Sequence, residues 1–249
     1  LVSSAPEQPQ LERWLQRQLS VDGERLQELR QKLWSEISWQ RTDRVLILGG
    51  RSLLWSLDPL GAVAEGGLTI VCSSSREQLR LDAQLQLLDP LHQPAVLADI
   101  EELDQLSPQH RFEVVGGRLN QEDLKTTDLE QFWACVSSRS TSGTQLRLLL
   151  SEPQLGPAGG LLELLMGERE ARQPSSSLQA LAELESIWLS QEKERQRLLS
   201  CLEQCGWIVN QSSWQESLKL SVEPNLVERW LAEDRPYRRA LERSGEVGE

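Results

Sequence analysis

The stretch Asp43-Arg-Val-Leu-Ile-Leu-Gly-Gly-Arg-Ser-Leu-Leu-Trp-Ser-Leu57 decides how the rest of the chain is interpreted. An apolar run, Val45 to Leu48, ends at a glycine pair, and a helical pattern takes over from Leu53. This order predicts a buried parallel strand, a tight turn and the start of a helix. Backbone N–H groups at such a helix start can hold an anion or a nucleotide. The stretch has no Gly-x-Gly-x-x-Gly and no acidic residue in the strand, so it indicates a fold class more than a function.

The composition is that of a globular protein with a large negative charge. The chain has 249 residues, a formal net charge of −12 and 26% charged residues. Such a charge repels phosphate backbones, so we expect no direct nucleic-acid binding by this chain. No apolar run approaches the ~20 residues that cross a bilayer, and no signal peptide is visible, so we expect a cytoplasmic protein without membrane contact. The four cysteines are not spaced as a disulfide framework or a metal site, which predicts free thiols and no metal.

Short apolar segments alternate regularly with helical patterns through the first 150 residues. The predicted strands are Val45–Leu48, Leu68–Cys72, Pro94–Asp99, Arg111–Val115 and Gln145–Ser151. This alternation implies parallel pairing, right-handed crossovers and helices on both faces. Two closely spaced segments, Trp207–Asn210 and Ser217–Val222, predict an antiparallel pair at the end. The predicted fold class is therefore α/β, with a doubly wound, mostly parallel sheet of about seven strands and additional N-terminal helices.

The chain divides into four predicted regions. Residues 1–10 read as a Ser/Pro/Gln-rich linker to an upstream segment of a longer polypeptide. Residues 11–40 carry two amphipathic helices, interpreted as a structural layer, with self-association through this layer as an alternative. Residues 41–222 form the α/β domain, which includes a loop and helical insertion over residues 152–190. Residues 223–249 are predicted to be a last helix and a tail.

The order of elements resembles the class I S-adenosylmethionine-dependent methyltransferase fold from about residue 23 to residue 222. A second resemblance rests on Trp39-Gln-Arg-Thr-Asp-Arg-Val-Leu46 followed by Ser52-Leu-Leu-Trp55. It is similar to the methyltransferase-like C-terminal region fused to AAA+ ATPases of the replication-associated recombination protein A type in cyanobacterial proteins. This second likeness implies an upstream ATPase in the same chain, or another protein, as the partner. Nothing in these residues matches a Walker A motif.

The cofactor loop of the family is matched only in part. In the family, the first strand ends in an acidic residue and a Gly-x-Gly-type loop lies against the methionine part of the cofactor. Here Ile47 takes the acidic position, and Gly49 and Gly50 match the loop. Arg51 and Ser52 stand where small glycines are expected. Arg51 also brings bulk and a positive charge near a cofactor whose sulfonium is positive.

The resemblance assigns four more candidate positions. At the end of the second strand, the family's ribose-binding acid is replaced by Ser73, which offers a hydroxyl. Asp99 fits the position that recognises the adenine amino group, although a helix N-cap is the favoured role for it. Glu113 and Asn120 match the substrate side of the fourth strand and its loop.

Two functional hypotheses follow. The favoured one is a non-catalytic methyltransferase-like interaction or regulatory module of a larger replication or recombination AAA+ protein, with no cofactor and no catalytic residue. In it the glycine pair serves only the turn. The alternative is an active S-adenosylmethionine-dependent methyltransferase of unknown substrate, with Ser52, Ser73 and Asp99 on the cofactor and Glu113 or Asn120 near the substrate.

Overall fold

The structure is a computed structural model. It describes residues 26–50, 52–119, 121–126, 128–152, 156–167, 176–190 and 192–215, and residues 225, 228, 231, 232 and 238. The predicted linker, the first predicted helix and the strand Ser217–Val222 lie outside the described residues, as do Arg51 and Asn120. The chain forms two compact units, Leu1–Ser151 with Arg197–Trp207, and Glu152–Gln196 with Ile208–Glu249.

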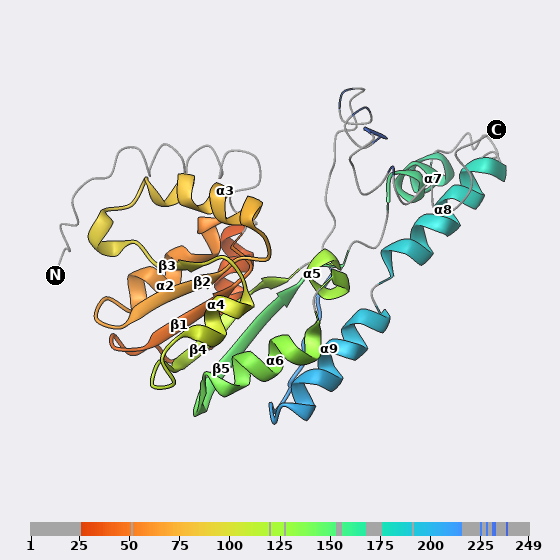
Figure 1. Ribbon diagram of the computed structural model, residues 1–249. Helices are drawn as coiled ribbons and strands as arrows, with labels where there is room; N and C mark the ends of the chain where they lie inside the picture. The colour runs from red at the N-terminus through yellow and green to blue at the C-terminus, as the bar shows by residue number, and fades with distance from the viewer. Residues whose placement is uncertain are drawn as a thin grey trace. The chain divides into compact units, whose positions relative to one another are not determined.

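The first unit is built around a parallel sheet of five strands in the order β3-β2-β1-β4-β5 (Figure 1). The strands are β1 (Arg44–Leu48), β2 (Gly67–Val71), β3 (Ala95–Leu97), β4 (Phe112–Leu119) and β5 (Ser140–Leu150). β1 is central, with β2 on one side and β4 on the other. A strand with neighbours on both sides and helices on both faces is buried throughout, which explains its continuous apolar run. The predicted α/β class with a doubly wound parallel sheet is confirmed.

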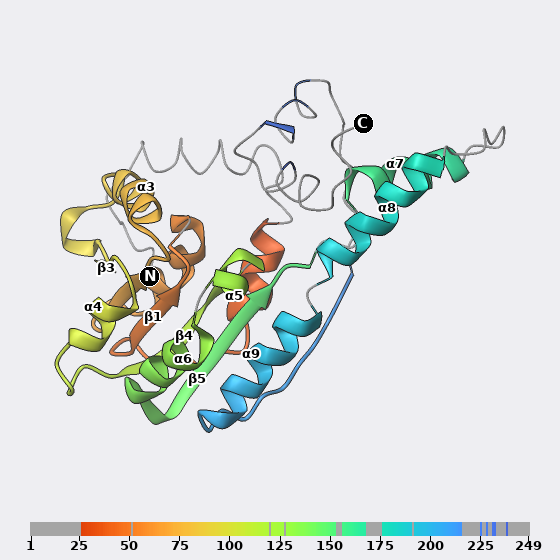
Figure 2. The same ribbon diagram turned by 45° about the vertical axis from the view of Figure 1, so that its right-hand side comes forward.

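The connecting helices are short. They are η1 (Leu53–Ser56), α2 (Leu57–Ala62), α3 (Ser75–Leu85), η2 (Pro90–His92), α4 (Ile100–Gln105), α5 (Gln121–Thr126) and α6 (Leu129–Ser138). Figures 1 and 2 both show α4 and α6 side by side along one face of the sheet. Residues 26–34 are also helical, as the sequence predicts, and Leu33 and Trp34 join the buried cluster that contains Val45 and Ile47. Since successive strand residues point to opposite faces, this cluster covers only one side of β1.

Two strands are longer than predicted. Gly116 to Leu119, expected as a loop, belongs to β4, because Gly116 and Gly117 pair with Ile47 and Leu48 of β1. β5 begins at Ser140, well before the predicted start at Gln145. Glycine and serine give a local turn signal in both segments. In β4 the pairing of Gly116 and Gly117 with β1 outweighs it, and in β5 Ser140 pairs with Phe112 ahead of an irregularity in the register.

The strand predicted at Trp207–Asn210 is wrong. These residues form no regular secondary structure. The Trp207 indole N–H donates to the Ser137 hydroxyl at 2.8 Å, so a side chain attaches the segment to α6. The predicted antiparallel end of the sheet is thus missing from the described residues.

The second unit contains α7 (Pro157–Gly167), α8 (Ser176–Leu189) and the beginning of α9 (Glu192–Gln204). α7 and α8 pack against each other. The Glu185 carboxylate, only 3% exposed, accepts hydrogen bonds from the N–H groups of Ala158 (2.9 Å) and Gly159 (2.8 Å). A carboxylate from α8 thereby satisfies backbone donors at the start of α7. Across the described residues, we find no helix with the length and apolarity of a membrane span.

Candidate functional site

The topology directs attention to the carboxyl edge of the sheet. The chain passes from β1 to β2 on one side and later returns to β4 on the other side of β1. In open α/β sheets, ligands bind outside the carboxyl ends of the strands at such a reversal. Gly49, Ser73 and Asp99 come shortly after β1, β2 and β3, so the fold brings these predicted site residues to one edge.

The glycine pair after β1 is required by its surroundings. Gly49 has φ +82°, and its N–H donates to the Val71 carbonyl at 3.2 Å. A Cβ on Gly49 would lie 2.9 Å from the Arg118 carbonyl oxygen, and one on Gly50 would lie 2.7 Å from the Cys72 sulfur. The glycines therefore permit a close turn between β2, β4 and α3. This packing accounts for their presence whether or not a ligand binds.

The helix start after β1 does not present free donors at its first positions. The Leu53 N–H donates to the Gln84 side-chain oxygen at 2.8 Å. The Leu54 N–H donates to the Ser52 hydroxyl at 3.3 Å, and the Trp55 N–H to the Ser52 carbonyl at 3.4 Å. Ser52, predicted to contact a cofactor, is the N-cap of η1. Since these N–H groups are already bonded within the chain, the anion-holding role of a helix start is not realised by them.

Ser73 lies in a loop fixed by a capping box. The Glu77 N–H donates to the Ser74 hydroxyl at 3.3 Å, and Glu77 in turn accepts from the Ser73 N–H at 2.5 Å. The Ser73 hydroxyl donates to Asp123 Oδ1 at 3.3 Å. Asp123 belongs to α5 and is 7% exposed.

Asp123 is a residue that sequence reasoning missed. Its helix, Gln-Glu-Asp-Leu-Lys-Thr, is short and polar, with one apolar residue, Leu124, and therefore no hydrophobic period. The available signal was its position, because a carboxylate shortly after a parallel strand comes to the same edge as Ser73 and Asp99.

Asp99 has the helix N-cap role that the sequence favours. Its Oδ1 accepts hydrogen bonds from the N–H groups of Glu101 (2.9 Å) and Glu102 (3.0 Å) at the start of α4. Glu102 completes the capping box by accepting from the Ala98 N–H at 2.8 Å. The Asp99 side chain remains exposed at the end of β3, so the capping role leaves it accessible to a donor from solution.

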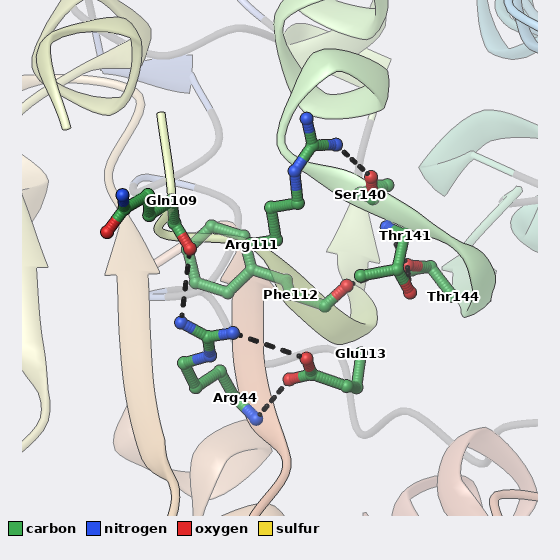
Figure 3. A network of polar contacts seen from close by, with 8 residues as sticks. All are labelled: Arg44, Gln109, Arg111, Phe112, Glu113, Ser140, Thr141 and Thr144. Atoms are coloured by element: carbon green, nitrogen blue, oxygen red, sulfur yellow. Dashed lines mark hydrogen bonds and ion pairs between the residues drawn. The ribbon is translucent and has the colours of Figure 1, made fainter. Parts of the chain in front are cut away.

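Glu113 is separated from the other candidate residues. It lies near the beginning of β4, where its carboxylate accepts from the Arg44 N–H at 2.7 Å and lies 3.5 Å from the Arg44 guanidinium (Figure 3). The same guanidinium donates to the Gln109 carbonyl at 3.4 Å. This network occupies the amino edge of the sheet, opposite Gly49. Asn120, the other predicted substrate residue, lies outside the described residues.

A cation and a buried thiol complete the carboxyl edge. The Arg118 guanidinium lies 5.6 Å from the centroid of the Trp55 ring and donates to the Ser151 hydroxyl at 3.1 Å. Burial, with the nearby carboxylates of Glu77 and Asp82, raises the pKa of Cys72 to about 12. This thiol stays protonated at neutral pH and is a poor nucleophile. We find no metal-binding cluster of three or more His, Cys, Asp or Glu side chains in the described part of the chain.

No known protein family matches the sequence. No curated protein matches it either. Solved structures do match, among them methyltransferases. A precorrin-6y C5,15-methyltransferase from Geobacter metallireducens is 17% identical, with a TM-score of 0.41 over 56% of this chain and 70% of that one. Coclaurine N-methyltransferase is 16% identical, with a TM-score of 0.41 over 51% and 36%. A putative methyltransferase from Thermoplasma acidophilum is 15% identical, with a TM-score of 0.35 over 44% of each chain.

These similarities are of fold. The chain spans less than half the length of two of the three structures. They also correct one prediction, that of no cofactor, because several matching structures hold one. The coclaurine enzyme is bound to S-adenosylhomocysteine, and a glycopeptide N-methyltransferase is complexed with S-adenosylmethionine. The sheet order and flanking helices of this chain are those of a Rossmann-like α/β fold.

Proposed function

We propose that this chain is a methyltransferase-like domain that binds S-adenosylmethionine at the carboxyl edge of its sheet. The observation that carries the proposal is the chemistry of that edge. Its side chains include hydrogen-bond acceptors, namely the Asp99 carboxylate and the Ser73 hydroxyl, while the first N–H groups of η1 are already bonded within the chain. Such an edge suits a nucleoside that carries no phosphate.

The acceptors match the donors of this cofactor. An exposed carboxylate at the end of β3 can accept from an exocyclic amino group on adenine. A serine hydroxyl after β2 can exchange hydrogen bonds with ribose hydroxyls. The cofactor also carries a positive sulfonium, which the net charge of −12 favours over an anionic nucleotide. When bound, it would supply an electrophilic methyl group.

Isothermal titration calorimetry with S-adenosylmethionine and S-adenosylhomocysteine tests the proposal. We expect binding by the unmodified protein and a roughly 10–100-fold loss of affinity in Asp99→Ala, which removes a hydrogen bond to a charged group. Asp128→Ala is the matched control, because Asp128 caps α6 as Asp99 caps α4. It removes a helix cap at a residue to which the proposal assigns no contact with the cofactor.

Two results would overturn the proposal. One is no heat of binding with either compound at millimolar concentration. The other is tighter binding of ADP than of S-adenosylhomocysteine, since that would show a phosphate site at this edge. If Asp99→Ala and Asp128→Ala lose the same amount of affinity, the loss would be due to helix stability, and Asp99 would not belong to the site.

A second candidate is a binding module without methyl transfer, attached to an AAA+ replication or recombination ATPase. The position of Glu113 at the amino edge supports it, because this carboxylate cannot act on a substrate at the carboxyl edge. Incubation with methyl-labelled S-adenosylmethionine and panels of nucleic-acid, protein and small-molecule acceptors separates the candidates. If the unmodified protein transfers label to an acceptor and Asp99→Ala does not, the second candidate is excluded.

A further inference from the structure

The hydrogen bond between Ser73 and Asp123 joins two segments that leave the sheet on opposite sides of β1. Ser73 follows β2, and Asp123 follows β4, while β1 lies between these two strands. Neighbouring strands are about 4.8 Å apart, so β2 and β4 are separated by roughly 10 Å. The chain after β4 must therefore reach across the carboxyl end of β1 for this bond to form at 3.3 Å.

The middle residues of α5, which makes this crossing, are buried. Asp123 is 7% exposed and Leu124 is 1% exposed, whereas Lys125 on the same helix is exposed. The Leu124 side chain and the Asp123 carboxylate thus contribute to holding α5 against the edge, at the topological reversal where the proposed ligand would lie.

We propose that α5 is a latch on this site, held closed by the Ser73–Asp123 hydrogen bond, which must open before the cofactor enters. The inference rests on the proposed function, because it concerns access to the same edge. A helix of this length is marginal on its own and keeps its position through such contacts. Loss of the bond therefore shifts α5 toward the open arrangement and raises the rate at which a ligand enters.

Asp123→Ala tests the latch without altering Ser73. We expect S-adenosylhomocysteine to associate about 3–10-fold faster in stopped-flow experiments, the range that loss of the hydrogen bond to Ser73 would give by itself. Amide hydrogen exchange within residues 121–126 of the ligand-free protein should accelerate by a similar factor. Asp123→Asn keeps an acceptor oxygen, so it should increase the association rate and the hydrogen exchange less than Asp123→Ala does. Lys125→Ala is the control for a change in the same helix that leaves the bond intact.

The outcomes separate the two proposals. Binding by the unmodified protein, together with faster association and faster exchange in Asp123→Ala than in Lys125→Ala, would support the latch. If the unmodified protein binds and Asp123→Ala matches Lys125→Ala in both association and exchange, the latch is excluded while the proposed function stands. Weaker binding by Asp123→Ala would also overturn the latch, because Asp123 would then act as a ligand contact. Absence of binding in every variant would overturn both.

Discussion

Replacing Gly117 by alanine is expected to destabilise the first unit strongly. Gly117 lies in β4 opposite Leu48 of β1 and has φ +157°. A Cβ at this position would lie 2.1 Å from the Leu48 carbonyl oxygen and 3.0 Å from the Leu48 nitrogen. Both obstructing atoms belong to the backbone, so no side-chain rotation can relieve the contact. The two strands would have to separate at the edge that carries the candidate site.

The size of the effect follows from what this separation breaks. Two ladder hydrogen bonds contribute about 0.5–1.5 kcal/mol each, and the unfavourable backbone conformation adds about 1–3 kcal/mol. We therefore expect a loss of about 3 kcal/mol in the free energy of unfolding, or roughly 6–12 °C in Tm for a chain of this size. Gly61→Ala is the matched control, because Gly61 lies in α2 and a Cβ there meets nothing within 4 Å. It should be neutral or stabilising.

Urea unfolding followed by tryptophan fluorescence measures the difference. Trp34, Trp55 and Trp133 are buried in the first unit, so their emission reports its unfolding. Separate transitions of the two units would be fitted individually, since the two-state treatment applies to each. The free energies of unfolding of Gly117→Ala and Gly61→Ala are then compared. If they agree within about 0.5 kcal/mol, the close approach of β1 and β4 is incorrect.

Three further predictions concern buried polar groups. Glu185→Ala leaves the N–H groups of Ala158 and Gly159 without this acceptor. It should lower the free energy of unfolding by about 2 kcal/mol and speed hydrogen exchange at these two amides. Unchanged exchange would contradict the capping role. Arg139→Met removes donors to the Leu106 and Ser107 carbonyls at 2.7 and 2.9 Å, with an expected cost of about 2 kcal/mol in the free energy of unfolding measured with urea. Arg147→Met serves as the comparison, because the Arg147 side chain is only partly buried and should cost less. The pKa of Cys72 is raised to about 12, so the unfolded state, with a thiol pKa near 9.0, releases its proton first. The free energy of unfolding should therefore fall as pH rises from 9 toward 12, and it should fall less steeply in Cys72→Ala. If the urea midpoints of the unmodified protein and of Cys72→Ala change by the same amount between pH 8 and pH 10.5, the prediction is refuted.

Much of the sheet was predictable because its signals are local. The run Val45–Leu48 is apolar at every position, as a central parallel strand requires. The Asp99 cap was predictable for the same reason, since its partners lie two and three residues away. By contrast, Gly116 and Gly117 carry a turn signal, and only their pairing with β1 keeps them in a strand.

The fold class, the central strand and the candidate residues Gly49, Ser73 and Asp99 at one edge could be inferred without a structure. These conclusions depend on periodicity and on residues that follow strands directly. The structure was needed to show that Glu113 bonds Arg44 at the opposite edge and that Asp123 contacts Ser73 across β1. Ser73 and Asp123 are separated by 50 residues, and their contact depends on strand order. Strand order arises from the packing of the whole sheet, which no short stretch of sequence encodes.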